Sequence, residues 1–427
     1  MTVVGVDDTD SRKRGMCTTY LAARIAERIE AAGGTVERRL LVRLNPAVER
    51  KTRGNAALAL HTDLNADAAT DLARGELTPL AELDDPRTSP GLVVADCAAE
   101  AVPGAIAEFA REAVRGFHDL DDALELADSA GFHTEGWAGG HGRIGALAAV
   151  GAFRAFEEWT YERIGYRAFD RCGTPREVDE ASLFAAAADT YPEAWDTVDR
   201  GAQEAVCVPN APGPILYGIR GDTPEAVRAV AERVESESIE RHALFLTNQG
   251  TDAHLRDVAA GDLGELRDGR AYCVDCVVAG EPETRRGGHV FVQISGADSD
   301  VELAAAAFEP TKRFRDRVRA LRPGDELTVC GEVSDGTVKL EKFAVRRLNR
   351  TREANPTCPD CGRSMSSAGR NQGYRCRDCG TAAAEKTEVE IDRDLEPGWY
   401  EVPPCARRHI AKPLVRGGFD GPTHPER

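Results

Sequence analysis

The side chains best suited to chemistry lie near the amino terminus, in the stretch GVDDTDSRKRGMCTTYL. Asp7, Asp8 and Asp10 follow an apolar run typical of a strand, and like charges this close repel each other unless a cation or protons intervene. Carboxylates are ligands that Mg²⁺ prefers, so the spacing favours a magnesium site that bridges to phosphate near the next helix. The plainer alternative is a turn built on the local hydrogen bonds of aspartate.

Thr18 and Thr19 open the helix predicted over residues 18–34. A hydroxyl at this position can simply cap the helix, and composition alone favours that interpretation. If the carboxylates hold Mg-ATP, the same hydroxyl becomes a candidate phosphate acceptor.

Two further stretches suit phosphate binding. ERKTRGN places two cations before a glycine, and GWAGGHGRIGAL places several glycines at the start of a predicted helix. Backbone amides at such a junction suit an anion, although glycines beside a helix also form ordinary tight turns. Together with the acidic cluster they predict one ATP site, with the candidates Lys51, Arg53, Gly54, Asn55, Gly140, Gly142, Arg143 and Gly145.

Four cysteines form the most specific motif in the chain. Two CxxC pairs, each followed by glycine, let two tight turns present four thiolates to one Zn²⁺ ion. A four-thiolate site is closed and therefore structural. The predicted ligands are Cys358, Cys361, Cys376 and Cys379. Cys273 and Cys276 form another CxxC, but they lie inside a predicted strand, where ordinary packing is the favoured interpretation.

A polar segment, TNQGTDAHL, follows a predicted strand. Its hydrogen-bonding side chains suit substrate recognition, and Asn248, Gln249 and Asp252 are the candidates. The alternative is a polar loop held by local hydrogen bonds.

The elements that must position these residues predict a multidomain α+β protein. Strands and helices alternate over 1–117, in an order that a ferredoxin-like domain fits, and 118–265 forms a second α+β domain whose segment 139–146 completes the ATP site. Residues 268–348 give five strands with a helix after the third, which is the order of an OB-fold. Residues 354–427 hold the zinc ribbon and a tail.

Composition limits the class of protein. The 427 residues carry 72 acidic and 54 basic side chains, and only seven of the basic ones are lysine. This bias is typical of an intracellular protein of a salt-loving organism, so the net charge of −18 says little about partners. The sequence has neither a long apolar span nor a signal peptide, and we expect a cytoplasmic protein with no membrane partner.

Several motifs, in this order, resemble one family: GVDDTDSRKRGMCTTYLA, RLNPAVERKTRGN, GGHGRIGALAA, LYGIRG, TNQGTD and the four-cysteine ribbon. They are similar to the archaeal tRNA(isoleucine) 2-agmatinylcytidine synthetases. The resemblance implies a kinase-like amino-terminal domain, a ferredoxin-like domain, an OB-fold and a zinc ribbon. It also implies that ATP phosphorylates the C2 oxygen of the wobble cytidine of a CAU anticodon. The amine of agmatine would then attack C2 and displace the phosphorylated oxygen as phosphate.

The resemblance assigns roles to particular residues. Asp7, Asp8 and Asp10 would hold Mg²⁺, and Thr18 would become phosphorylated, while Lys51, Arg53 and Arg143 would neutralise phosphate charge. The candidate tRNA contacts are Lys312, Arg313, Arg315, Arg407, Arg408 and His409, together with the ribbon arginines.

Two alternatives remain open at this point. One is a non-catalytic nucleic-acid-binding protein built on the OB-fold and ribbon. The other is an ATP-dependent enzyme that uses a different amine or base.

Overall fold

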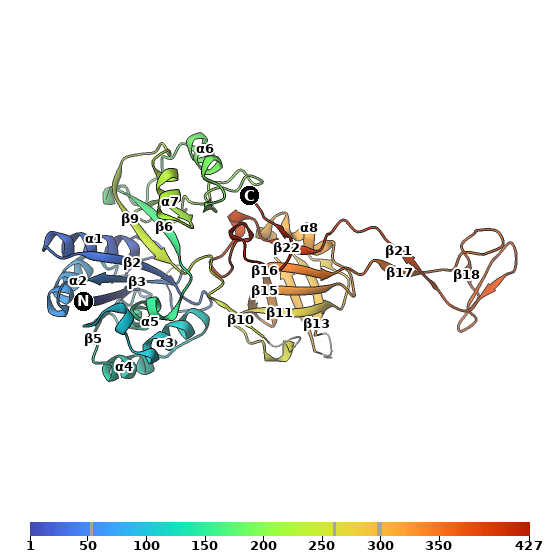
Figure 1. Ribbon diagram of the computed structural model, residues 1–427, viewed down its shortest axis with the longest axis horizontal. Helices are drawn as coiled ribbons and strands as arrows, with labels where there is room; N and C mark the ends of the chain where they lie inside the picture. Colours follow the sequence, from blue (N-terminus) through green and yellow to red (C-terminus); the bar gives the residue numbers. More distant parts are fainter. Residues whose placement is uncertain (52–53, 259–261, 297–300) are drawn as a thin grey trace.

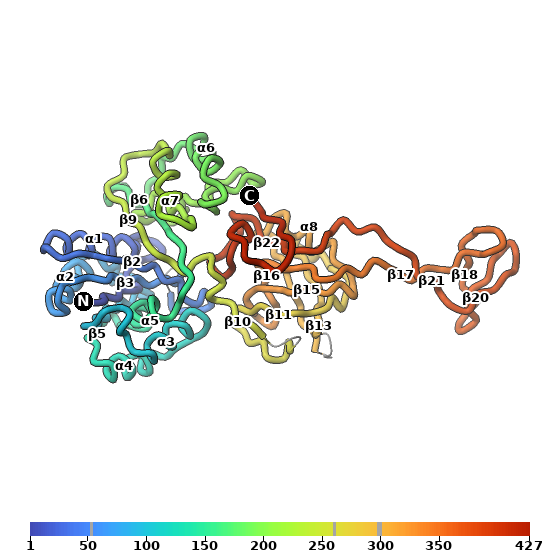
Figure 2. Tube along the Cα trace, viewed as in Figure 1, coloured from blue at the N-terminus to red at the C-terminus, as the bar shows by residue number. Residues whose placement is uncertain are grey.

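The computed structural model describes residues 1–51, 54–258, 262–296 and 301–427. The chain forms a body with helices and a large sheet, a barrel, and a small cysteine-rich tip on a slender stalk (Figure 1). After the tip the chain returns to the barrel, and its carboxyl terminus lies between the barrel and the body (Figure 2). None of the helices in the described ranges could span a bilayer.

Nine strands of the described residues form the sheet of the body, in the order β5-β4-β1-β3-β2-β9-β6-β8-β7. Neighbours are antiparallel except β2 and β9, which pair in parallel and join the two halves of the sheet. The strands are β1 (Thr2–Asp7), β2 (Val36–Arg43), β3 (Ala56–Thr62), β4 (Gly91–Ala95), β5 (His133–Gly136), β6 (Thr160–Arg167), β7 (Ala194–Trp195), β8 (Ile215–Gly221) and β9 (Ile239–Thr247).

Helices cover both faces of the first half of this sheet, because β1 is apolar on both sides. Val4 and Val6 pack with α1 and α2, whereas Val3 packs with α3 and α5 on the other face. In the second half, α6 and α7 cover β8. The helices are α1 (Thr18–Ala31), α2 (Ala66–Leu80), α3 (Gly104–Arg115), α4 (Leu120–Ser129), α5 (Gly142–Ala155), α6 (Glu180–Thr190) and α7 (Pro224–Ala231).

The sequence pattern predicts strands over 2–6, 36–44, 54–62, 91–97, 215–221 and 242–248, and helices over 18–34, 104–115, 121–131, 143–156 and 223–234. All of these are confirmed, with small differences at their ends. Five elements have no counterpart in the prediction: α2, β5, β6, α6 and β7. The segment of α2 is rich in alanine and polar residues, and β6 contains Glu162, Arg163 and Arg167, so neither shows a clear apolar pattern.

The sheet continues across residue 117, where the sequence places a domain limit. Helix α5 packs closely on β1 and β4, because a Cβ on Gly5 would lie 2.3 Å from the carbonyl oxygen of Ala146 and one on Gly91 would lie 2.0 Å from the amide of Arg143. Strand β5 pairs with β4. Residues 118–155 therefore pack with the first strands of the chain, while β6 to β9 form the other half of the body.

Five strands in the described part of residues 271–347 close a barrel through the pairings β11-β13-β14-β16-β15-β11. Helix α8 (Phe314–Arg319) follows the third strand and buries Phe314 against Phe343. The predicted strand order and the helix position are confirmed, although the helix is shorter than predicted. The strands are β11 (Ala271–Val278), β13 (Val290–Ser295), β14 (Glu302–Ala307), β15 (Glu326–Ser334) and β16 (Thr337–Arg347), with β10 (Leu255–Asp257), β12 (Glu283–Thr284), β22 (Gly398–Glu401) and β23 (Thr423–His424) at the edges.

A two-stranded stalk, β17 (Thr351–Ala354) and β21 (Thr387–Glu390), carries the tip away from the barrel (Figure 1). The tip holds β18 (Ser366–Ser367), β19 (Tyr374–Arg375) and β20 (Ala382–Ala383). Its buried core consists of Cys358, Met365 and Cys376. So small a core cannot stabilise a module by itself, and such modules rely on a bound metal.

Candidate active site

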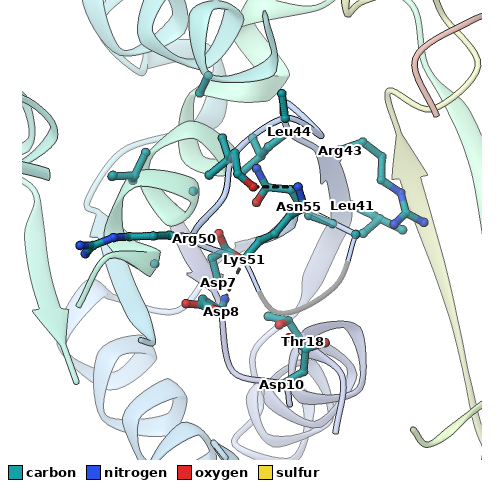
Figure 3. A pocket seen from close by; sticks show the side chains of 18 of the residues that line it. Asp7, Asp8, Asp10, Thr18, Leu41, Arg43, Leu44, Arg50, Lys51 and Asn55 are labelled. Carbon is teal, nitrogen blue, oxygen red and sulfur yellow. Dashed lines mark hydrogen bonds between the residues drawn. The ribbon is translucent and has the colours of Figure 1, made fainter. Parts of the chain in front are cut away.

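A cavity of about 1020 Å³ opens where the two halves of the body meet the barrel. Its walls come from β1, β2, β3, β6 and β8, from the starts of α1 and α5, and from the barrel edge at the end of β15. Figure 3 shows part of this lining. The cavity brings together most of the residues predicted for catalysis and ATP binding: Asp7, Asp8, Asp10, Thr18, Lys51, Gly54, Asn55, Gly142 and Gly145.

The acidic cluster lies where β1 ends. Asp7 is the last residue of the strand, and Asp8 leaves it with a φ of 57°, a left-handed conformation that residues other than glycine seldom adopt. An Asp7 oxygen accepts a hydrogen bond from the Asp8 amide at 2.6 Å, and an Asp8 oxygen accepts one from the Ser89 amide at 3.0 Å.

Burial makes these carboxylates costly to ionise. Burial, together with the charges of Asp8 and Asp10, raises the pKa of Asp7 well above its ordinary value. Burial likewise raises the pKa of Asp8 to about 7. A divalent cation would offset this cost by holding the carboxylates in their charged form. The residues therefore fit Mg²⁺.

The aspartates do not converge into a complete cage. Among the residues that the structure describes, the zinc-motif cysteines alone form a group of potential metal ligands whose atoms lie within 4.8 Å of one another. This arrangement suits Mg²⁺, which binds through one or two carboxylates and completes its shell with water and substrate phosphates.

Thr18 is the first residue of α1, and Cys17 holds the capping position with an extended φ of −159°. The predicted alternative, a Thr18 cap, is therefore wrong. The Thr18 hydroxyl instead lies 3.1 Å from the Thr9 hydroxyl and 3.4 Å from the Thr9 amide, in the loop that carries the aspartates. This contact holds the hydroxyl beside the acidic cluster (Figure 3).

The glycines before α5 allow a close approach to β1. A Cβ on Gly145 would lie 1.9 Å from an Asp7 carboxylate oxygen, and one on Gly142 would lie 2.8 Å from the Asp7 carbonyl oxygen. The Gly142 amide already donates to the Ser89 carbonyl at 2.8 Å. The lack of a side chain on Gly142 and Gly145 thus lets α5 lie directly against Asp7.

Arg143 and Gly140 lie beside the cavity lining. The Arg143 guanidinium turns back and donates to the carbonyl oxygen of Gly140 at 2.9 Å. Arg50 bridges the two predicted phosphate-binding stretches instead, because its guanidinium lies 2.6 Å from His141 Nε2. Sequence reasoning did not select Arg50 or His141, which line the cavity.

The loop before β3 contains the stretch ERKTRGN, which is also predicted to bind phosphate. Lys51 Nζ donates to the carbonyls of Pro46 and Val48, which holds the ammonium within its own loop. Burial lowers the pKa of Lys51. Asn55 ties the loop ends together by donating to the Asn45 carbonyl at 2.9 Å. The prediction for Arg53 lies outside the described residues.

A charged cluster on β2, β6 and β8 also lines the cavity. Arg43 lies 3.2 Å from one oxygen of Glu162, and Arg220 lies 3.7 Å from the other. Gly218 makes room, since a Cβ there would lie 2.7 Å from the same carboxylate. Sequence reasoning missed these residues, because Glu162 and Arg163 interrupt the apolar alternation expected of a strand.

The predicted substrate-binding residues after β9 hold the fold together. The Asn248 side chain accepts from the Arg43 amide at 2.8 Å and donates to the Arg43 carbonyl at 3.0 Å, which extends the pairing of β2 and β9. Gln249 accepts from the Arg43 guanidinium at 3.1 Å. Asp252 joins the body to the barrel through Lys342 Nζ at 2.6 Å.

The predicted tRNA contacts Arg407 and Arg408 in the tail are half-buried and pair with carboxylates. Arg407 pairs with Asp196 and lies 2.8 Å from Glu401. Arg408 lies 2.6 Å from Glu332 and 2.5 Å from Glu341.

His409 is half-buried as well, with its ring 5.0 Å from that of the buried His254. The tail segment thus joins barrel and body in this structure.

The predicted contacts near α8 differ in exposure. Lys312 is exposed, whereas Arg313 pairs with Asp199 at 3.0 Å. Arg315 donates to the Gly288 carbonyl at 2.8 Å. The exposed Lys312 is the member of this group whose charge faces solvent.

The four predicted zinc ligands come together at the tip. Their sulfur atoms lie within 4.8 Å of one another. The amides of Gly362 and Gly380 donate to the carbonyls of Cys358 and Cys376, and both glycines have a φ of 74°, which closes two matching turns. This geometry fits a structural Zn²⁺ ion.

Comparisons with known proteins match the chain along its length. Three family models fit: the TiaS TCKD domain over residues 3–66, the TiaS FLD domain over 140–254 and the TiaS C-terminal zinc ribbon domain over 355–395. The isoleucine-2 tRNA 2-agmatinylcytidine synthetase TiaS of Haloquadratum walsbyi is 56% identical, with 100% of both chains covered. That of Methanosarcina mazei is 44% identical, with 97% of each covered.

Solved structures agree with these relatives. The crystal structure of a complex of TiaS with isoleucine-2 tRNA and ATP is 42% identical, with a TM-score of 0.89 over 100% of this chain and 99% of that chain. A complex of TiaS with the same tRNA, AMPCPP and agmatine is 39% identical, with a TM-score of 0.86 over the same shares. The resemblance seen in the motifs is confirmed, and the chain belongs to the family of isoleucine-2 tRNA 2-agmatinylcytidine synthetases, TiaS.

Proposed function

We propose that this chain is an ATP-dependent ligase that converts the wobble cytidine of the CAU-anticodon isoleucine tRNA to 2-agmatinylcytidine, so that the tRNA reads AUA. ATP phosphorylates the C2 oxygen, and the primary amine of agmatine attacks C2 and expels phosphate. The names of the relatives and the tRNA, nucleotide and agmatine in the similar complexes support this proposal.

One observation in the structure carries the chemistry: three buried or half-buried aspartates and a threonine hydroxyl converge on one large cavity. Its volume of about 1020 Å³ lies at the upper end of the roughly 300–1,000 Å³ of ordinary ligand pockets. The cavity therefore has room for a nucleotide and for part of a second substrate.

The aspartates would supply the negative charge that binds the metal ion in this site. When bound, Mg²⁺ would neutralise phosphate charge during the transfer. Asp7, Asp8 and Asp10 would hold the ion, and Thr18 would accept a phosphoryl group at the start of α1, where the helix dipole favours negative charge. The nucleotide would lie against Gly54 and Asn55, with Lys51 and the α5 glycines nearby.

The target base has to leave its stack to reach the cavity, since the C2 edge is inaccessible inside an anticodon loop. The barrel supplies part of the cavity rim through Asp268, Ser334 and Asp335. The remainder of the tRNA would contact the barrel and the ribbon, which the stalk holds away from the body.

The domain assignment belongs to the same proposal. We assign 1–117 as kinase-like and 118–265 as ferredoxin-like, with residues 118–155 packing on the kinase-like strands. We assign 268–348 as an OB-fold and 354–427 as the zinc ribbon with its tail. The cellular site would be the cytoplasm, where tRNA is modified.

The test is a reconstitution with purified protein, ATP, Mg²⁺, agmatine and the CAU-anticodon isoleucine tRNA in concentrated KCl. Mass spectrometry of nuclease digests should show one cytidine that gains the mass of agmatine less water. The Asp8→Asn variant should bind the tRNA without forming this product. Unmodified tRNA in the presence of folded wild-type protein would refute the proposal, and product formed with putrescine but not agmatine would indicate a different amine.

A further inference from the structure

Cys273 and Cys330 face each other across two neighbouring strands of the barrel. They are register partners in the antiparallel pair β11 and β15, and their sulfur atoms lie 2.9 Å apart. The CxxC motif of Cys273 and Cys276 misleads, because residues three apart in a strand point to opposite faces. Cys276 packs in the barrel core, whereas Cys273 lies on the outer wall.

The backbone places this pair in the geometry that cross-strand disulfides need. The Cys273 carbonyl accepts from the Val258 amide at 3.3 Å, on the side of β10. The amide and carbonyl of one strand residue point to the same side, so those of Cys273 point away from β15. The pair with Cys330 is therefore of the non-hydrogen-bonded kind, with Cα atoms about 4.5 Å apart, which lies within the roughly 4.4–6.8 Å that a disulfide spans.

The two cysteines differ in their exposure to solvent and to dissolved reagents. Cys330 is fully buried beneath the tail residues Ile410 and Leu414, whereas Cys273 is only partly buried. Burial raises the pKa of Cys330 well above its ordinary value, and the Lys342 ammonium opposes this shift. Cys273 is thus the sulfur that a small oxidant meets first.

We propose that Cys273 and Cys330 form a redox-modification site, a dithiol that a low-molecular-weight disulfide converts to a cross-strand disulfide. The Cys273 thiolate attacks the reagent disulfide, forms a mixed disulfide and releases one reagent thiol. The Cys330 thiolate then attacks the Cys273 sulfur and releases the second reagent thiol. Two protein thiols are oxidised, and one reagent disulfide is reduced to two thiols.

The bond would tie together two strands that reach the rim of the cavity. Asp268 and Gly269 precede β11 and line the cavity, as do Glu332 and Ser334 at the end of β15. The crosslink joins residues 57 positions apart, so it restricts the unfolded chain more than the folded barrel.

The experiment uses zinc-loaded full-length protein treated with hydroxyethyl disulfide at pH 8, followed by alkylation, digestion and mass spectrometry. A peptide pair linked through Cys273 and Cys330 should dominate, and Tm should rise by several degrees and return on reduction. The Cys276→Ser variant should keep both effects, and Cys273→Ser should lose both.

Three outcomes would overturn the proposal. One is alkylation of both Cys273 and Cys330 after the reagent has reached equilibrium with the protein. Another is a link between Cys273 and Cys276, and the last is a Tm rise that persists in Cys273→Ser. Because mapping does not depend on catalysis, the result is independent of the proposed enzymatic function.

Discussion

Replacing Gly145 by alanine should damage the active site while leaving the protein folded. The new Cβ would lie 1.9 Å from an Asp7 carboxylate oxygen and 3.0 Å from a Leu44 methyl carbon. To regain ordinary contact near 3.4 Å, the Asp7 carboxylate has to move by about 1.5 Å. This displacement would take it out of the acidic cluster, which it shares with Asp8 and Asp10.

The magnitude follows from the atoms involved. A displacement of about 1 Å in a reacting geometry costs roughly 100-fold in rate, so kcat/KM for agmatidine formation should fall by at least that factor. Stability should change little, because alanine favours a helix over glycine by about 1 kcal/mol and the Asp7 side chain can rotate at a similar cost.

Gly151 in the same helix provides the matched control. A Cβ there would lie 2.5 Å from the carbonyl oxygen of Ile106, a backbone atom that cannot rotate away, and the contact is with α3. Gly151→Ala should lose about 1–3 kcal/mol to overpacking, partly offset by helix propensity, and keep its activity per folded molecule. Urea unfolding and kinetics of both variants check that Gly145→Ala loses mainly activity and Gly151→Ala mainly stability. A Gly145→Ala enzyme within threefold of wild type, or equal activity losses in both variants, would refute the reasoning.

The other predictions concern separate parts of the molecule. Thr18→Ala should reduce turnover at least about 100-fold with a stability loss near 1 kcal/mol, and Thr18→Ser should restore turnover; an active alanine variant would return Thr18 to a structural role. Glu162→Gln leaves Arg43 without its buried partner and should cost about 3 kcal/mol in urea unfolding, whereas an unchanged midpoint would show that the ion pair is dispensable. Cys376→Ser should lose zinc, measured by a metal-binding dye, and weaken tRNA binding while ATP binding survives; equal loss of both would contradict the separation of ribbon and body. Burial lowers the pKa of His254 from 6.5 to about 3. Between pH 6.5 and pH 3 the imidazole is therefore protonated in the unfolded chain but not in the folded one. Stability should therefore fall by about 2 kcal/mol between pH 7 and pH 5 on account of His254, and His254→Gln should flatten the profile by that amount in urea titrations.

Features encoded by short-range patterns could be read from the sequence. The four zinc ligands follow from local spacing, because each CxxC turn forms within a few residues. The barrel strands follow from alternation, since Tyr272 and Val274 point inward from β11 with one residue between them. The acidic cluster is also local, because Asp7 to Asp10 follow directly on β1.

Tertiary structure alone decided which distant segments meet. Glu162 reaches Arg43 across 119 positions, and Arg407 reaches Asp196 across 211. A charged side chain looks the same in a sequence whether it faces solvent, tRNA or a buried partner, so Arg407 and Asn248 could be predicted as ligand contacts although they hold the fold together. Likewise, the size that Gly145 must have depends on how closely α5 approaches Asp7. Local pattern specifies the elements, whereas packing between remote elements determines which polar groups remain free to act.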